Sequence, residues 1–368
     1  IAMLLGTILF YFLKNKYVVS PEGKPLGGLP SKNESSDYEE GEAQKAVFTP
    51  TALAVALACF AGLFLLFHFS VDGDNVVKTI IYPIIYASGI TLAGLILSDS
   101  SLTKIERDRI LVIYIVSFFI IFFWAAFEQA GSSLTFIADN QTDRTFMLGW
   151  QMPASMVQIF NGLFVVALAL PFSLLWDKLR AKEKEPVSPL KQAIGLALIA
   201  LSYFIIAHNV KDLGNSGLLA IKWLMLLYLI QTMGELCLSP IGLSLVGKLA
   251  PKRFASLLYG VFFISNAAGY ALAGSLGAII PATGDKFEKA EKLGVNLQDV
   301  LDKKVTLTAE QLALFEKEQL PIANTTFAGF EIHNLYEFFM VFVILCGIAA
   351  IILALLSPRL KKMMNGIT

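Results

Sequence analysis

The sequence predicts an all-α integral membrane protein. Of its 368 residues, 56% are hydrophobic and 16% are charged, whereas average soluble domains carry roughly a quarter charged residues. The hydrophobic residues gather in blocks of about 20 or more, the length that crosses a hydrocarbon core of about 30 Å as a helix. Lipid offers no hydrogen bonds to an exposed backbone, so such blocks are typical of membrane-spanning helices.

Eight full blocks follow a polar N-terminal region. Residues 1–18 contain an apolar run that ends at Lys14, without an initiator Met or a signal-peptide cleavage site, and we expect them to be the end of a helix. Residues 19–49 are rich in Gly, Pro and Ser and predict a linker. The predicted spans are Pro50–Phe69, Thr79–Leu97, Ile110–Ala138, Pro153–Trp176, Leu190–Ala207, Leu218–Val246, Phe254–Ile280 and Asn334–Leu356.

Two of these blocks are too long for simple spans. Leu218–Val246 would extend about 43 Å at the helical rise, beyond the hydrocarbon core. It contains Pro240, so we expect a tilted or kinked helix, and Ile110–Ala138 is similarly long and contains Gly131. A long connection, residues 281–332, separates the last two blocks, and we expect it to form one or two amphipathic surface helices.

Successive connections between the predicted spans lie on alternate sides of the membrane, and most lysines and arginines lie on one of these sides. The positive-inside rule identifies that side as cytoplasmic. We therefore expect the linker and the C-terminus to be cytoplasmic and the long connection to be external. The basic residues of the cytoplasmic side include Lys14, Lys16, Lys104, Arg107, Arg109, Lys178, Arg180, Lys182, Lys248, Lys252, Arg253, Arg359 and Lys361.

Two carboxyl side chains lie deep inside predicted spans. Glu128 follows an aromatic run, and Glu235 lies midway between Lys222 and Lys248. A charged group at the bilayer centre costs roughly 3 kcal/mol on insertion scales, so such residues usually have a function. We expect one of the two acids to bind and release a proton, or to pair with an amine.

Other polar residues predict a cavity shared by the two acids. Trp124 and Ser132 lie four residues on either side of Glu128, and Gln231 lies four before Glu235, so helical spacing places them on the same faces. Asn161 has two interpretations, a residue lining this cavity or one that packs helices together beside Gly162. Asn266 is the strong polar group of a span rich in small residues.

Several classes of function find no support in the sequence. It contains no Walker sequence, no metal-ligand spacing and no nucleophile elbow, so we expect no enzyme activity, metal or cofactor. The net charge of zero and the lack of a basic patch argue against nucleic acid as a partner. The three cysteines lie in apolar blocks and are expected to pack helices.

Two stretches resemble a known family. "FFWAAFEQAGSSLTFIAD" and "QTMGELCLSPIGLSLVGKLAPKRFASLLYG" resemble the proton-coupled oligopeptide transporter family, a branch of the major facilitator superfamily. The resemblance implies that residues 1–18 end a helix of an N-terminal bundle that lies outside this chain. Residues 50–99 are then two inserted helices, as in bacterial members, and residues 100–368 are the C-terminal six-helix bundle.

The resemblance also implies roles for individual residues. Glu128 matches the acid implicated in proton coupling, and Glu235 matches the acid that binds the peptide amino group. Asn161 resembles the asparagine that assists Glu235, and Trp124 resembles a wall of the pocket. Phe262 stands where the family often places Trp. The remaining candidate substrate-binding residues are Ser132, Gln231 and Asn266.

Our leading hypothesis is therefore that the chain is part of a proton-driven symporter of di- and tripeptides. This symporter would work by alternating access in a bacterial inner membrane. The proton gradient would drive it without a cofactor. One alternative keeps the fold and carries another small solute, such as nitrate. A less favoured alternative is a proton-relay subunit of a membrane enzyme complex, which predicts a series of mid-membrane lysines; Lys222, near one end of its span, is the only intramembrane lysine.

Overall fold

The chain forms two units, residues 1–44 and 45–368. The computed structural model describes residues 2–19, 46, 48–70, 75–146, 149–214 and 217–367. The first unit contributes helix α1 (Ala2–Tyr17), an apolar helix with Lys14 and Lys16 in its last turn. Most of the predicted linker, residues 20–45 and 47, lies outside the described residues.

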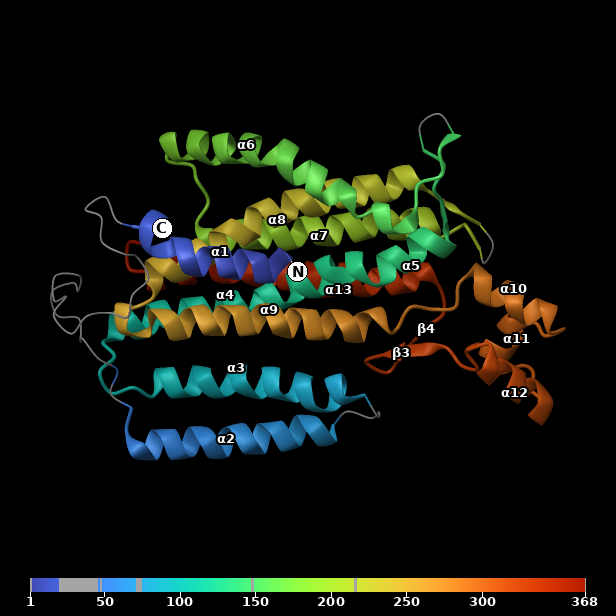
Figure 1. Cartoon of the computed structure of the whole chain (residues 1–368), viewed down its shortest axis with the longest axis horizontal. Helices are drawn as coiled ribbons and strands as arrows, with labels where there is room; N and C mark the ends of the chain where they lie inside the picture. Colours follow the sequence, from blue (N-terminus) through green and yellow to red (C-terminus); the bar gives the residue numbers. More distant parts are fainter. Residues whose placement is uncertain are drawn as a thin grey trace. The chain divides into compact units, whose positions relative to one another are not determined.

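Within the described part of the second unit, eight helical segments are long and apolar enough to cross a membrane, and each corresponds to one predicted span (Figure 1). The chain is thus a membrane protein of the predicted all-α class. The long helices are α2 (Pro50–Phe69), α3 (Tyr82–Leu97, preceded by the π-helical turn η2, Val77–Ile81), α4 (Lys104–Phe127), α6 (Ile159–Ala181), α7 (Ser188–Val210), α8 (Ile221–Leu249), α9 (Ala255–Gly277) and α13 (Leu335–Met363).

Short elements complete the second unit. Strands β1 (Thr142–Asp143) and β2 (Leu219–Ala220) pair in parallel. Short helical turns precede α6 and α9, and two further short segments continue α4. These elements are η3 (Glu128–Gly131), α5 (Ser133–Asn140), η5 (Ala154–Met156) and η6 (Lys252–Phe254).

The two long spans differ in their continuity. The α4 segment changes at Glu128 into the 3₁₀ turn η3, and Ser132, at φ −130° and ψ −99°, separates this turn from α5. In contrast, α8 continues from Ile221 to Leu249 with Pro240 inside the helix. The interruption also means that Trp124, Glu128 and Ser132 do not share one continuous helical face, so that expectation is wrong for Ser132.

The long connection between α9 and α13 is more structured than predicted. It contains α10 (Gly284–Lys292), α11 (Leu297–Leu301) and α12 (Ala309–Lys317), followed by an antiparallel hairpin of β3 (Thr325–Phe327) and β4 (Phe330–Ile332). The expectation of one or two helices is therefore wrong. We call residues 284–320 the loop domain, because they enclose a small core of their own: Ala290, Val295, Leu297, Val300, Leu301, Phe315 and Leu320.

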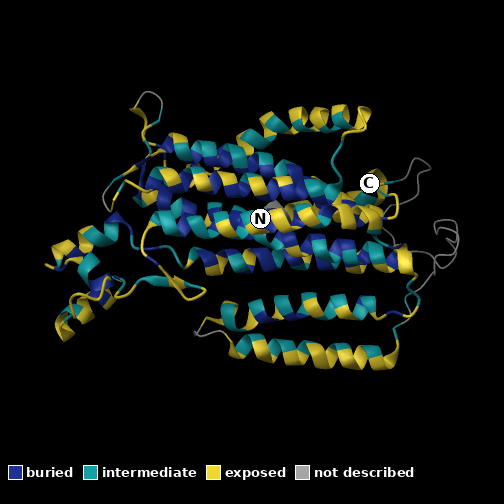
Figure 2. Ribbon diagram, turned by 180° about the vertical axis from the view of Figure 1, so that it is seen from behind, coloured by how far each residue is buried: buried dark blue, intermediate teal, exposed yellow. Residues whose placement is uncertain are grey.

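The buried core of the second unit lies among five helices. α7 packs against both α8 and α13, and α4 packs against α9. Tyr203 of α7 stacks on Phe342 of α13 with ring centroids 4.7 Å apart. By contrast, α2 buries no residue and α6 buries only Phe160, and Figure 2 shows mostly exposed and intermediate residues along both helices. Apolar faces of this length require lipid or protein around them.

Glycines set the close approach of α7 and α8. A Cβ atom added at Gly195 would lie 2.8 Å from the Gly234 carbonyl oxygen, and one at Gly234 would lie 2.9 Å from the Gly195 oxygen. Small residues at such crossings let helix backbones pack closely in membranes. The pair also fixes the position of Glu235, the next residue along α8.

Replacing Gly195 with Ala should therefore destabilise the protein. Backbone atoms cannot move aside as a flexible side chain does, so we expect a loss of about 1–3 kcal/mol, typical of overpacking. Thermal unfolding in detergent would measure it. Gly162→Ala is the matched control, because nothing lies within 4 Å of a Cβ added there. Equal stability of the two variants would contradict the packing role of Gly195. The open space beside Gly162 also argues against close helix packing at Gly162.

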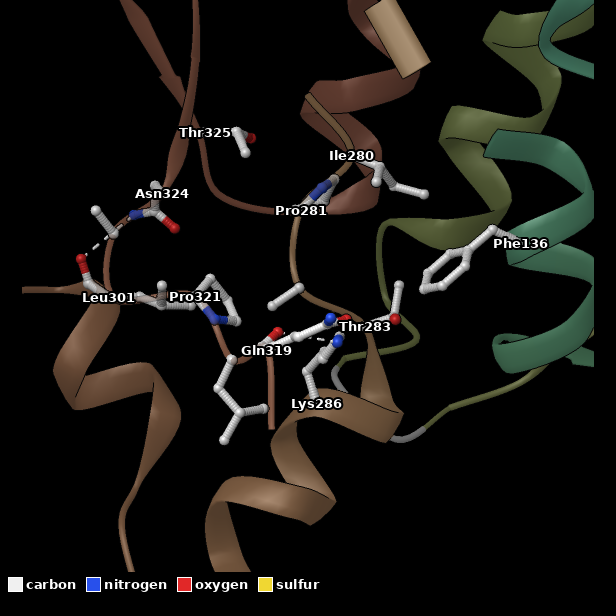
Figure 3. Close-up of a pocket in the computed structure, with 13 residues that line it drawn as sticks. Phe136, Ile280, Pro281, Thr283, Lys286, Leu301, Gln319, Pro321, Asn324 and Thr325 are labelled. Atoms are coloured by element: carbon white, nitrogen blue, oxygen red, sulfur yellow. Dashed lines mark hydrogen bonds between the residues drawn. The ribbon is translucent and has the colours of Figure 1, made fainter. Parts of the chain in front are cut away.

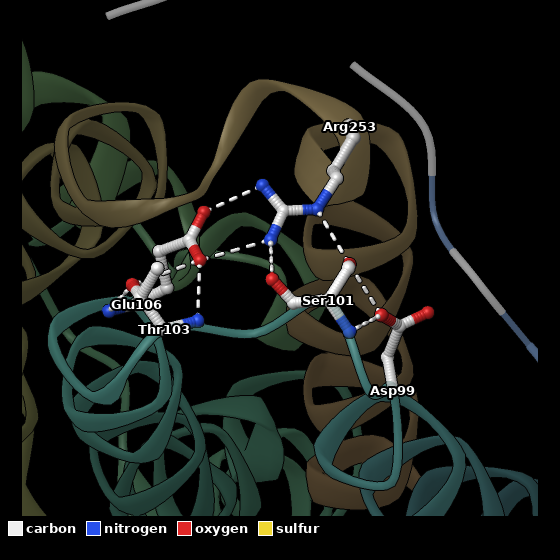
Figure 4. A network of polar contacts seen from close by, with 5 residues as sticks. All are labelled: Asp99, Ser101, Thr103, Glu106 and Arg253. Carbon is white, nitrogen blue, oxygen red and sulfur yellow. Dashed lines mark hydrogen bonds and ion pairs between the residues drawn. The ribbon is translucent and has the colours of Figure 1, made fainter. Parts of the chain in front are cut away.

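A buried polar network joins the start of α4 to the α8–α9 connection (Figure 4). Thr103 and Glu106 form a capping box that starts α4 at Lys104 rather than at the predicted Ile110. Arg253 donates to both carboxylate oxygens of Glu106, at 2.5 and 2.9 Å, and to the Ser101 carbonyl oxygen at 3.2 Å. Ser101 in turn hydrogen-bonds to Asp99, which follows α3. The network therefore connects α3, α4 and η6.

Candidate functional site

The site is built around the interruption that follows α4. Gln129, which is fully buried, holds this interruption in shape. Its amide nitrogen donates to the carbonyl oxygens of Ala125 and of Ala273 on α9, both at 3.0 Å. Its amide oxygen accepts from Ser133 at 2.6 Å and from Ser132 at 3.2 Å. The broken segment thus has a defined geometry, and Glu128 lies at its first residue.

Glu128 lies among groups from three helices. Trp124 packs edge-on against Tyr270 of α9, with centroids 5.8 Å apart and planes at 77°. The Glu128 carboxyl group is close enough to act electrostatically on Tyr270 and to be acted on by Glu235 of α8. The two acids predicted to share a cavity are thus close enough to interact electrostatically. Both are half-buried, and Tyr270 is 46% exposed.

Glu235 is held by a chain of hydrogen bonds from α6. The Asn161 amide nitrogen donates to Glu235 Oε2 at 3.1 Å and to the Thr232 hydroxyl oxygen at 3.0 Å. Thr232 donates onward to the Tyr228 carbonyl oxygen at 2.7 Å. These bonds place Asn161 beside Glu235 and also join α6 to α8, so they agree with both interpretations of Asn161. One carboxylate oxygen, Oε2, is oriented by these contacts.

Helix α9 carries one more of the predicted residues near Tyr270. Asn266 lies one turn before Tyr270, and its Oδ1 is buried without a hydrogen-bond partner among the described residues. The Trp124 indole Nε1 is likewise buried without a partner in that part of the chain. Unpaired buried polar atoms are rare and are commonly satisfied by water or a ligand. These atoms therefore provide an acceptor and a donor for water or a ligand.

The remaining predicted residues make contacts of other kinds. Ser132 bonds to Gln129, and Gln231 is fully buried beside Tyr203 in the bundle interior. Phe262 is 5% exposed, and its ring lies 3.0 Å from where a Cβ on Gly242 would stand. The structure thus brings Trp124, Glu128, Asn161 and Glu235 together, while Phe262 packs α9 against α8.

The sequence interpretation missed three residues of this site. Gln129, Thr232 and Tyr270 were each next to a candidate or one turn from it, at spacings that the sequence displays. The sequence shows that Gln129 is next to Glu128. It does not show that Gln129 bonds to Ala273 of α9, 144 positions along the chain, because only the folded chain brings the two residues together.

A cavity of about 840 Å³ lies between α6, α8 and the α6–α7 connection. Leu236 and Pro240, the residues one and five positions after Glu235, belong to its lining. Proline has no N–H to donate, so the Leu236 carbonyl lacks its usual helical donor. A missing helical hydrogen bond of this kind is tolerated where the backbone lines a cavity. The lining of the cavity also includes Phe172, Trp176, Arg180, Lys191 and Lys248.

A second cavity, of about 250 Å³, lies between α5, the end of α9 and the loop domain (Figure 3). Lys286 donates to the Gln319 carbonyl oxygen there at 3.1 Å, and Asn324 donates to the Leu301 oxygen at 3.4 Å. In the part of the chain that the structure describes, no Asp or Glu lines this cavity. Among the described residues, no cluster of His, Cys, Asp and Glu side chains could hold a metal ion.

Comparison with known proteins agrees with the resemblance noted above. The family model described as POT family matches residues 73–292. The peptide transporter YePEPT of Yersinia enterocolitica is 34% identical over 201 residues, which cover 54% of this chain and 39% of that protein. The uncharacterized transporter YclF of Bacillus subtilis is 31% identical over 278 residues, covering 74% and 51%. The chain thus spans about half the length, or less, of these relatives.

Solved structures share the fold. A POT family transporter in complex with 5-aminolevulinic acid superposes with a TM-score of 0.63 at 22% identity, covering 98% of this chain and 61% of that one. A peptide transporter POT in complex with sulfate gives 0.61 at 24% identity, covering 99% and 61%. The predicted all-α membrane fold is thereby confirmed, and the structures that share it are named as POT family transporters.

Proposed function

The chain belongs to the POT family, and from this premise we propose that it is part of a transporter that couples the uptake of di- and tripeptides to protons. The observation that carries the proposal is the pair of neighbouring intramembrane acids, one of them oriented by Asn161. Acids are rare in membrane helices and mark ion pathways and ligand sites. Relatives named as peptide transporters support the substrate class.

In this proposal Glu235 binds the peptide ammonium group. Asn161 occupies Oε2 only, so Oε1 and the remaining lone pairs stay available to the ligand. The same carboxylate would repel an anion, which disfavours nitrate as the substrate. Trp124, Tyr270 and Asn266 would contact the rest of the peptide. The groups that bind the peptide carboxylate would lie in a bundle outside this chain.

Glu128 has the proposed role of proton carrier. Its proximity to Glu235 means that a negative charge on one acid disfavours a charge on the other, so peptide binding at Glu235 and proton binding at Glu128 influence each other. A ligand shifts a conformational equilibrium only through unequal affinity for its two states. Coupling of proton and peptide through these neighbours would thus drive alternating access around a mid-membrane site.

The proposal includes a location and an orientation. The linker and the C-terminus would face the cytoplasm of a bacterial inner membrane, because the basic residues concentrate on that side. The proton gradient would supply the energy, with no cofactor and no enzymatic step.

Uptake of a labelled dipeptide into proteoliposomes under an inward proton gradient tests the function. The full transporter should accumulate the dipeptide, and Glu128→Gln should abolish accumulation while retaining exchange of peptide across the membrane. Glu316→Gln on the exposed face of α12 is the matched control. Undiminished accumulation by the Glu128 variant would refute its proposed role, and uptake of nitrate without uptake of dipeptide would refute the substrate class.

A further inference from the structure

The β3–β4 hairpin has one apolar and one polar face. Thr325 pairs with Ile332 and Phe327 pairs with Phe330, while Thr326 pairs with Glu331 between them. Directly opposed residues share a face, and successive residues alternate. The side chains of Phe327, Phe330 and Ile332 therefore lie on one face, and those of Thr326 and Glu331 lie on the other.

The two faces have different surroundings. Ile332 is 5% exposed in the core of the helix bundle, and Phe327 packs against that core. On the opposite face Glu331 pairs with Lys303 of the loop domain at 2.9 Å. The hairpin thus separates the bundle from the solvated loop domain, which sets its apolar face toward the membrane-spanning helices.

Phe330 departs from this pattern because it lies on the apolar face and is nevertheless 75% exposed. The whole turn is apolar, with the sequence Phe327-Ala328-Gly329-Phe330. Its central residues have φ of +49° and +85°. Asn, Asp and Gly adopt positive φ more readily than Ala and dominate such turns. The chain thus has an apolar residue at a position where a water-exposed turn favours a polar one.

The hairpin also lies at the level of the membrane boundary. The Thr325 hydroxyl donates to the Ile279 carbonyl oxygen at 2.7 Å, two residues beyond the end of α9. Figure 1 shows the hairpin directed back toward the helices, with its turn level with the C-terminal end of α9. A helix of 23 residues extends about 35 Å and therefore ends near the interface of the bilayer.

We propose that the Phe327–Phe330 turn inserts into the boundary between headgroups and acyl chains on this side of the membrane, with Phe330 as its anchor. The turn lies level with the end of a membrane-length helix, and its apolar Phe330 is exposed at that level, which identifies lipid as the occupant. Phe, Trp and Leu side chains form the apolar face of segments that bind at this boundary. The hairpin would then hold the loop domain against the bilayer, whichever side of the membrane it faces.

Site-directed spin labelling of the full transporter in nanodiscs tests the proposal. Cys59 is exposed and is first replaced by Ser, whereas Cys237 and Cys346 are buried. A nitroxide is attached at Phe330→Cys, and its accessibility to oxygen and to a water-soluble nickel chelate is measured. Thr326→Cys, on the polar face of the same hairpin, is the matched aqueous control. Ile351→Cys, 62% exposed on α13, is the lipid reference.

We expect a several-fold higher oxygen-to-nickel accessibility ratio at position 330 than at 326, approaching the ratio at 351. Nickel accessibility at 330 equal to that at 326 would place the turn in water and overturn the proposal. A label at 330 that is immobile and shielded from both reagents would overturn it as well, because protein rather than lipid would then cover the turn.

Discussion

Replacing Arg253 with Met should lower the free energy of unfolding by about 3–5 kcal/mol, the usual cost of removing one partner of a buried ion pair. The side chains of Arg253 and Glu106 are only 1% and 11% exposed. Without the guanidinium, the Glu106 carboxylate keeps its bonds to Thr103 but has lost its bidentate cationic partner. Thermal or denaturant unfolding in detergent measures the effect.

Two further variants make this prediction specific. Lys178→Met removes the same charge from an exposed position on α6, where surface substitutions usually change stability by less than about 0.5 kcal/mol. The double variant Arg253→Met, Glu106→Gln removes both charges and should recover part of the loss, because no unpaired charge remains buried. A single variant as stable as the Lys178 control, or a double variant less stable than the single, would contradict this account.

Glu235→Gln should weaken the binding of a dipeptide by about 2–5 kcal/mol, or roughly 30-fold to several thousand-fold. The proposed contact is a charge-assisted hydrogen bond in a half-buried site, and Gln offers no negative charge to the ammonium group. Asn161→Ala should have a smaller effect, about 1 kcal/mol, since it removes one hydrogen bond that orients the acid. Calorimetry on the purified full transporter measures both.

An N-acetylated dipeptide supplies the control for this experiment. It lacks the ammonium group, so its affinity should be low for the wild type and unchanged by Glu235→Gln. If the substitution weakened both ligands equally, the loss would reflect a distorted site and not a lost ion pair. A measured affinity for the free dipeptide within twofold of the wild-type value would refute the assignment of Glu235.

The spans and the two acids could be predicted because their signals are local. A run of apolar residues predicts a membrane helix wherever it folds, and a carboxylate inside such a run stands out in the sequence alone. The proximity of Asn161 to Glu235 was implied by family resemblance and is visible in the structure, 74 positions apart. Their roles in transport remain predictions.

The rest depends on contacts that only the folded chain creates. The bidentate pair of Glu106 with Arg253 joins residues 147 positions apart, and both looked like ordinary cytoplasmic charges. Helix α11 has five residues, too few to display an amphipathic period. The hairpin turn uses Ala-Gly in place of the Asn-Gly or Asp-Gly that would have predicted it.

The buried amide of Gln129 holds the backbone around Glu128 in shape without carrying a charge. An amide neither gains nor loses a proton over the biological pH range, so the bonds of Gln129 to Ala125, Ala273 and Ser133 do not depend on a proton of its own. The backbone on which the acid sits therefore need not rearrange each time a proton arrives or leaves. Little of the gradient's energy would be dissipated in local refolding, and the electrostatic change would pass to the neighbouring helices.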